Sequence, residues 1–86
     1  MDYELIYTAR AVKDIKKLDR VVQKKLKRAL ENFQKAPFSF GEKLISSKLG
    51  GYRFRAGDYR IIFDVEVEKI IILRVGHRRE IYKRWR

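Results

Sequence analysis

Three arginines gather around one predicted turn in the second half of the chain. Arg53 and Arg55 alternate with aromatic residues before Gly57-Asp58, and Arg60 follows that turn. A glycine-first pair of this kind predicts a two-residue β-hairpin, which sets Arg55 opposite Arg60 and Arg53 diagonally across from Arg60. Like charges that face each other on paired strands destabilise a sheet, so the cluster indicates an anion site. The alternative is that nearby acidic side chains neutralise the arginines, or that these extend into solvent.

A second polar cluster follows the last predicted strand. It contains His77, Arg78, Arg79 and Tyr82. Because this segment lies beside the turn end of the neighbouring strand, we expect Arg78 to come within reach of Arg60. The phenol of Tyr82 and the imidazole of His77 are the groups here that can give or take a proton. The alternatives are that Tyr82 only packs the chain end on the core and that His77 is an ordinary surface histidine.

The composition points to a polyanionic partner. The chain has 86 residues, with 22 Lys and Arg against 11 Asp and Glu, and a net charge of +11. Such a charge costs stability through self-repulsion, so we expect a nucleic acid first, an acidic protein second and an anionic membrane surface third. A basic surface without a partner is the remaining alternative.

The residue types that are missing exclude several chemistries. The chain has no cysteine and one histidine, which removes disulfides, thiol catalysis, iron–sulfur clusters and cysteine-ligated zinc. We therefore expect no metal site and no cofactor. No apolar run approaches the roughly 18 residues of a membrane span, and the acidic N-terminus is unlike a signal peptide. The sequence thus predicts one soluble, cytoplasmic domain over residues 1–86.

Basic and aromatic side chains without metal ligands suit RNA cleavage of the ribonuclease type. In that reaction the ribose 2′-OH attacks its own 3′-phosphate. The step needs a base, an acid for the leaving oxygen, and cations for the charge that develops on the phosphorane. Arg78 and the three arginines near the turn can supply the cations, and Tyr82 and His77 are the candidates for acid and base.

The first half of the chain predicts a strand and two helices. Residues 3–7 are rich in β-forming side chains, and Thr8 stands where a helix N-cap is expected. Asp19 predicts a second N-cap, because a clean apolar stripe from Val22 to Phe33 follows it at helical spacing. The solvent-facing arc of this second helix is basic and includes Lys24, Lys25, Lys27 and Arg28.

The second half predicts a three-stranded antiparallel meander. Residues 36–51 are rich in Gly and Ser and indicate a connecting loop, and strands are expected at 52–56, 59–67 and 70–75. Residues 79–85 predict a short C-terminal helix. We therefore expect an α+β domain of order β-α-α-β-β-β, with an antiparallel sheet, the helical hairpin packed on one face and the N-terminal strand paired with one sheet edge.

Several motifs resemble those of the RelE/ParE superfamily of toxin–antitoxin toxins, in its RelE branch. They are Lys-Leu-Gly-Gly-Tyr-Arg-Phe-Arg at 48–55, Gly-Asp-Tyr-Arg-Ile-Ile-Phe at 57–63, and Val-Gly-His-Arg at 75–78 followed by Tyr82. The Tyr-x-x-x-Tyr strand at 3–7 and the Lys-rich helical hairpin also match. The resemblance covers nearly the whole chain and implies a RelE-like fold, similar to that of microbial ribonucleases.

The resemblance also implies an activity and residue roles. RelE-like toxins cut mRNA in the decoding site of the ribosome, without metal, and leave a 2′,3′-cyclic phosphate. Arg53 and Arg55 match positions that hold the phosphate, and Arg60 and Arg78 match arginines that stabilise the transition state. Tyr82 matches a tyrosine that stacks on the substrate base and assists proton transfer.

Partners follow from the same resemblance. The basic side chains of the second helix, with His77 and Arg79, would bind RNA of the ribosome and the message. An acidic, RelB-like antitoxin would wrap the toxin, in a pair of heterodimers, and no membrane is involved. Two other functions stay open: a ParE-like inhibitor of DNA gyrase without nuclease activity, and a nucleic-acid-binding module without chemistry.

Overall fold

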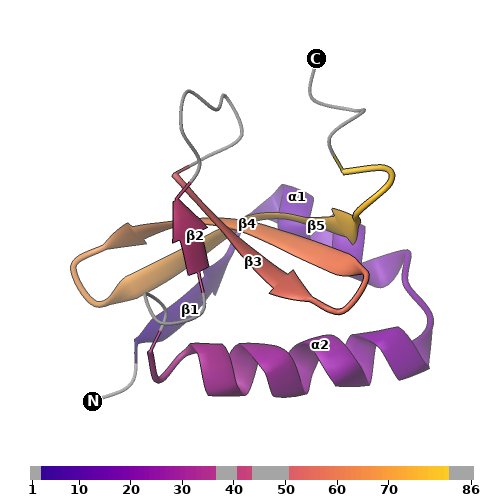
Figure 1. The fold of residues 1–86 in the computed structure, drawn as a ribbon, viewed down its shortest axis with the longest axis horizontal. Coiled ribbons are helices and arrows are strands. Elements are labelled where there is room, and N and C mark those ends of the chain that lie inside the picture. The colour runs from indigo at the N-terminus through magenta and orange to yellow at the C-terminus, as the bar shows by residue number, and fades with distance from the viewer. Residues whose placement is uncertain (1–2, 37–40, 44–50, 82–86) are drawn as a thin grey trace.

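The computed structural model describes residues 3–36, 41–43 and 51–81. Figure 1 shows how these residues form one sheet with a long helix running beneath it. In chain order the elements are β1 (Glu4–Tyr7), α1 (Ala9–Lys16), α2 (Arg20–Phe33), β2 (Gly41–Lys43), β3 (Tyr52–Ala56), β4 (Tyr59–Glu66) and β5 (Lys69–His77). The expected order is present with one addition, because the short strand β2 lies inside the segment 36–51 that was interpreted as a loop.

Both helices begin at the predicted N-caps. The hydroxyl of Thr8 accepts a hydrogen bond from the backbone N–H of Ala11 at 3.1 Å, and the Asp19 carboxylate accepts one from Val22 at 2.9 Å. A cap of this kind contributes about 1 kcal/mol. The Thr8 hydroxyl also donates to the carbonyl oxygen of Ile72 at 2.9 Å, which ties the start of α1 to β5.

The sheet is mixed, which corrects the expectation of an antiparallel one. Its strand order is β1-β5-β4-β3-β2, and β3, β4 and β5 form the predicted antiparallel meander, which β2 extends at one edge. At the other edge β1 pairs with β5 in parallel, with Leu5 opposite Ile70. The edge position of β1 is as expected. Its direction differs because the chain between β1 and the meander returns to its starting end, as a parallel connection requires.

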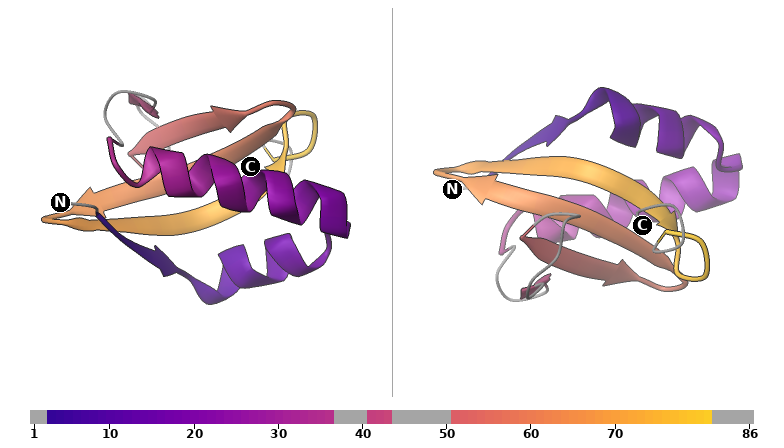
Figure 2. Two further views of the ribbon diagram at one scale, coloured as in Figure 1. Left: turned by 90° about the horizontal axis from the view of Figure 1, so that it is seen from below. Right: turned by 90° about the horizontal axis from the view of Figure 1, so that it is seen from above.

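The two helices occupy different positions around the sheet. The helix α2 crosses one face, and α1 continues from the end of β1 and lies beside the second half of β5 (Figure 2). The expected helical hairpin is therefore present, but only α2 covers the face.

The core lies between α2 and the sheet. The ring of Phe33 stacks on Phe54 with centroids 4.4 Å apart and meets Phe63 edge-on at 4.7 Å. Around these rings, Leu26 and Leu30 of α2 are almost completely buried. A buried Phe side chain of this kind contributes about 3–5 kcal/mol, so this cluster fixes how α2 sits on the strands.

A β-bulge in β5 turns one charged side chain away from the core. Ile62 pairs with Arg74, but the next pair along β4 already uses Ile72, so Leu73 is an extra residue. Because of this extra residue, Ile72 and Val75 both belong to the core under α2, while Arg74 lies on the opposite side.

The chain turns sharply after β5. The backbone N–H groups of Glu80 and Ile81 both donate to the carbonyl oxygen of His77 at 2.9 Å. Ile81 packs so closely on Gly76 that an added Cβ there would lie 3.3 Å from the Cβ of Ile81. Residues 78–81 therefore form a turn over β5 instead of starting the expected C-terminal helix. The remainder of that expected helix, with Tyr82, lies outside the described residues.

Candidate active site and nucleic-acid interface

Three arginines share the sheet face that lies opposite α2. Arg55 pairs directly with Arg60, and Arg53 pairs with Ile62, so the predicted hairpin register is confirmed. Phe54 between the two β3 arginines packs in the core under α2, and the alternation of a strand therefore turns the arginines to the other face. Arg55 is exposed, while Arg53 and Arg60 are half-buried.

The turn between β3 and β4 holds two arginines close together. Nη1 of Arg60 donates to the carbonyl oxygens of Gly57 at 2.8 Å and Tyr59 at 3.0 Å. The backbone N–H of Arg78 donates to the carbonyl of Asp58 at 2.7 Å, and its Nε lies 3.6 Å from a carboxylate oxygen of Asp58. Gly57 has a φ of +62°, a conformation that favours glycine. Arg60 and Arg78 are thus both anchored on this single turn.

Acidic neighbours neutralise this cluster only in part. The Arg78–Asp58 pair has side chains that are 51% and 66% exposed, and such an exposed pair contributes at most about 1 kcal/mol. The Asp64 carboxylate of β4 accepts a hydrogen bond from the backbone N–H of Gly51 at 2.6 Å. Arg60 donates to backbone carbonyls, which carry no net charge, so it keeps its positive charge for an anion.

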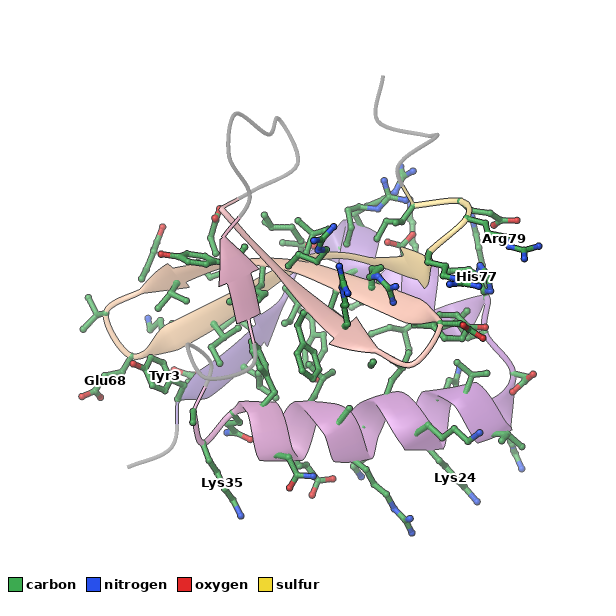
Figure 3. All side chains as sticks on the ribbon, viewed as in Figure 1. Tyr3, Lys24, Lys35, Glu68, His77 and Arg79 are labelled. Carbon is green, nitrogen blue, oxygen red and sulfur yellow. The ribbon has the colours of Figure 1, made fainter. Side chains whose placement is uncertain are left out.

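His77 lies at the same end of the molecule. Its ring meets that of Tyr59 edge-on, with centroids 5.5 Å apart and planes at 83°. Its Nδ1 accepts a hydrogen bond from the backbone N–H of Arg79 at 3.2 Å, so in the neutral ring the proton is on Nε2. Figure 3 shows His77 and Arg79 side by side at this end. Tyr82, the other predicted proton carrier, lies outside the described residues.

A second basic surface runs along the outer side of α2. Its side chains Lys24, Lys25, Lys27 and Arg28 are exposed, and Lys24 points away from the sheet in Figure 3. Because α2 covers the face opposite the arginines, the two basic surfaces lie on opposite sides of the molecule. Lys25 is the exception, because it lines a pocket with Gly57, Asp58 and Tyr59 at the turn that anchors Arg60 and Arg78.

A buried ion pair joins α1 to β5, and the sequence patterns did not predict it. Asp14 of α1 and Arg74 of β5 are only 7% and 5% exposed. The Arg74 Nε donates to Asp14 Oδ2 at 2.7 Å, and the backbone N–H of Val75 donates to the same oxygen at 3.0 Å. The available signal was a single charge inside the apolar run 70–75, since a buried charge needs a partner of opposite sign.

An apolar groove separates α1 from α2 on another side of the molecule. It encloses about 440 Å³ and is lined by Tyr7, Val12, Ile15, Leu26 and Leu30, among others. Burial raises the pKa of the Tyr7 phenol, because the site disfavours the charged phenolate. Tyr7 belongs to the edge strand β1 and therefore takes no part in the arginine cluster.

Within residues 3–36, 41–43 and 51–81, no three His, Asp or Glu side chains gather where they could hold a metal ion. No helix in those ranges has the length and apolar character to cross a membrane.

One protein family and two named relatives match nearly the whole chain. Residues 5–82 match the family described as the ParE toxin of the type II toxin–antitoxin system parDE. Toxin RelG of Mycobacterium tuberculosis is 31% identical over 87 residues, which cover 98% of this chain and 100% of the relative. Toxin RelE3 of Methanocaldococcus jannaschii is 34% identical over 83 residues, which cover 92% and 94%. The chain therefore belongs to the RelE/ParE toxin superfamily and is a type II toxin of the RelE family.

Solved structures show the same fold. The toxin–antitoxin complex RelBE2 of Mycobacterium tuberculosis superimposes with a TM-score of 0.78 at 26% identity, covering 90% of this chain and 99% of the other. The isolated E. coli RelE toxin gives a TM-score of 0.70 at 26% identity, covering 95% and 93%. Similar toxins from Pyrococcus horikoshii and Methanococcus jannaschii were crystallised as complexes of RelE with RelB.

Proposed function

We propose that this toxin is a ribosome-dependent mRNA endonuclease that inhibits translation. The observation that carries the proposal is the anchoring of Arg60 and Arg78 on one turn, with Arg55 directly opposite Arg60. Guanidinium groups held in place before the substrate arrives stabilise developing negative charge without reorganising during the reaction. The two similar proteins are named as toxins of the RelE type, and the resemblance to that branch implies this activity.

The proposed reaction needs proton transfer and charge stabilisation but no redox step. The 2′-OH gives up its proton, its oxygen bonds to the adjacent phosphorus, the P–O5′ bond breaks, and O5′ takes up a proton. The products are a 2′,3′-cyclic phosphate and a 5′-OH end. Arg60 and Arg78 stabilise the phosphorane, Arg53 and Arg55 hold the phosphate, and Tyr82 serves with His77 as a proton carrier.

The basic outer side of α2 supplies the contact with ribosomal RNA. Apart from Lys25, which lines a pocket beside the turn, its basic side chains lie opposite the arginine face, so the toxin can bind ribosomal RNA on one side and the message on the other. Arg79 and His77 extend the message-binding surface at the end of the sheet. Binding through such charges weakens as salt is added, because it releases counterions from the phosphates.

The inhibitory partner is an acidic, RelB-like antitoxin in the cytoplasm. A net charge of +11 suits a partner of opposite charge. The RelE–RelB complexes of similar toxins support this pairing. We expect the two proteins to assemble as a pair of heterodimers.

Cleavage during translation in vitro tests the function. The wild-type protein should produce new 5′ ends inside the message, mapped by primer extension, only when ribosomes are present. Arg60→Ala and Arg78→Ala should each reduce cleavage about 100- to 1000-fold, while Glu68→Gln on the far hairpin cleaves normally. Cleavage that persists in both arginine variants would contradict the site, and binding without any products would leave only a nucleic-acid-binding module.

Gyrase inhibition is the second candidate, because the matching family is described as ParE. It predicts that the protein blocks supercoiling of plasmid DNA and leaves translation untouched. Inhibition of supercoiling at a concentration that does not cut message would replace the nuclease proposal.

A further inference from the structure

A cavity of about 310 Å³ opens at the end of β5, where it is lined by the residues that directly precede Arg60 and Arg78. It lies along the edge of β5 that β1 leaves uncovered, between the end of α1 and the turn after β5. Its walls and rim include Lys17 and Leu18 from the end of α1, Tyr59 from β4, His77 from β5, and Glu80 and Ile81 from the turn. A volume of this size is at the lower end of small-ligand sites.

The charged groups on the floor of the cavity already bind each other. Asp14 and Arg74 line it, and both oxygens of the Asp14 carboxylate accept hydrogen bonds from Arg74, at 2.7 Å from Nε and 3.3 Å from Nη2. The backbone N–H of Val75 occupies the same carboxylate at 3.0 Å. The ion pair therefore shapes the site, and recognition falls to the residues on the walls.

The walls combine flat apolar surfaces with hydrogen-bonding groups. The rings of Tyr59 and His77 and the side chains of Leu18 and Ile81 are the apolar part. Because Nδ1 of His77 is occupied by the backbone of Arg79, its Nε2–H is the donor that the ring has left. A nucleobase has this same combination of flat faces and polar edges, and proteins bind unstacked bases of single-stranded RNA on such walls.

The rim adds charges of both signs. Lys17 and Glu80 are exposed at the mouth of the cavity, so one can donate to carbonyl or ring-nitrogen acceptors of a base and the other can accept from its amino and imino groups. A plain anion site would not place a carboxylate there.

The position of the cavity links it to the cleavage site. Arg78 follows His77 directly and is bonded to Asp58 in the same turn that anchors Arg60. The cavity residues Tyr59 and His77 directly precede Arg60 and Arg78 in the chain, which brings the cavity close to a phosphate that these arginines hold. We propose that this cavity binds one nucleobase adjacent to the cleaved phosphate and so contributes to the sequence preference of the toxin. The role in cleavage rests on the nuclease function proposed above.

Titration with mononucleotides tests the cavity without ribosomes or cleavage. Adenosine, guanosine, cytidine and uridine 5′-monophosphates should each be added to the labelled protein, with ribose 5-phosphate as the control without a base. At least one nucleotide should shift the ring resonances of His77 and Tyr59 when ribose 5-phosphate does not. His77→Ala should weaken that nucleotide about 10-fold, as expected for one lost stacking surface. Equal shifts with ribose 5-phosphate, or no shifts with any nucleotide, would overturn the proposal.

Mapping of cut sites on the ribosome provides the second test. Lys17→Ala and Glu80→Gln on the rim of the cavity should redistribute the mapped 5′ ends among codons, whereas Glu68→Gln at the opposite end of the molecule should keep the wild-type distribution (Figure 3). If both cavity variants cut the same positions in the same proportions as wild type, the cavity has no role in specificity. That result would leave the nuclease function itself intact.

Discussion

Arginine serves two opposite purposes within one sheet. Arg74 is 5% exposed and donates to the buried Asp14 carboxylate. Arg60, in contrast, is half-buried and donates to the carbonyl oxygens of the turn. Arg78 is partly exposed and lies near the exposed Asp58. A buried guanidinium with a full partner fixes the fold and has no charge to offer a ligand. Arg60 and Arg78 keep their charge available for a ligand. The difference between the two groups is therefore the local counter-charge and not the residue type.

Breaking the buried pair should have the largest effect. Asp14→Ala leaves Arg74 without its carboxylate and the N–H of Val75 without its acceptor. The free energy of unfolding should fall by about 3–5 kcal/mol, measured by urea denaturation.

A double variant serves as the control for that prediction. Asp14→Leu combined with Arg74→Met removes both charges, and it should recover a large part of the lost stability, because no charge is left unpaired. If Asp14→Ala alone changes stability by less than about 1 kcal/mol, the pair behaves like an exposed one. The contrast between Arg74 and the arginines at the turn would then be wrong.

Straining the turn should have an intermediate effect. Gly57 has a φ of +62° and open space around it, so Gly57→Ala tests the backbone conformation alone. We expect a loss of about 1–2 kcal/mol in stability, and a loss of cleavage greater than the loss of folded protein, because Arg60 and Arg78 both depend on this turn. Gly57→Asn, which tolerates this conformation better, should lose less in both measurements. Equal activity per folded molecule in all three proteins would show that the conformation of this turn does not affect cleavage.

Relieving the repulsion between Arg55 and Arg60 should have the smallest effect on stability, and it should raise stability instead of lowering it. Arg55→Gln removes one of two like charges that face each other across β3 and β4. Stability should rise by about 0.2–1 kcal/mol, read from thermal unfolding at low salt, while the affinity for RNA falls. A variant that is less stable than wild type would show that the other contacts of the Arg55 side chain outweigh this repulsion.

Local patterns in the sequence were sufficient for much of the fold and for the hairpin that carries the arginines. The caps Thr8 and Asp19 and the register around Gly57 were predicted correctly, because each depends on a few neighbouring residues. The direction of β1, the short strand β2 and the turn at 78–81 were not. They depend on contacts between distant segments, such as Ile81 on Gly76, that no local pattern contains.

The candidate site divides in the same way. The hairpin register was enough to place Arg53, Arg55 and Arg60 on one face, and the end of β5 was enough to bring Arg78 to the turn. The Asp14–Arg74 pair was missed because a β-bulge at Leu73 decides which way Arg74 points. The cavity that the pair helps to form was therefore also invisible in the sequence.

The bonds between the first and last thirds of the chain have a consequence for the cell that makes it. Glu4 bonds to Glu68, Thr8 to Ile72 and Asp14 to Val75. The segment that contains β5 must therefore be synthesised before the N-terminal segment can dock and the sheet can close. Contacts this distant in sequence slow folding. A chain interrupted before β5 thus has no partner for β1 and cannot complete the sheet.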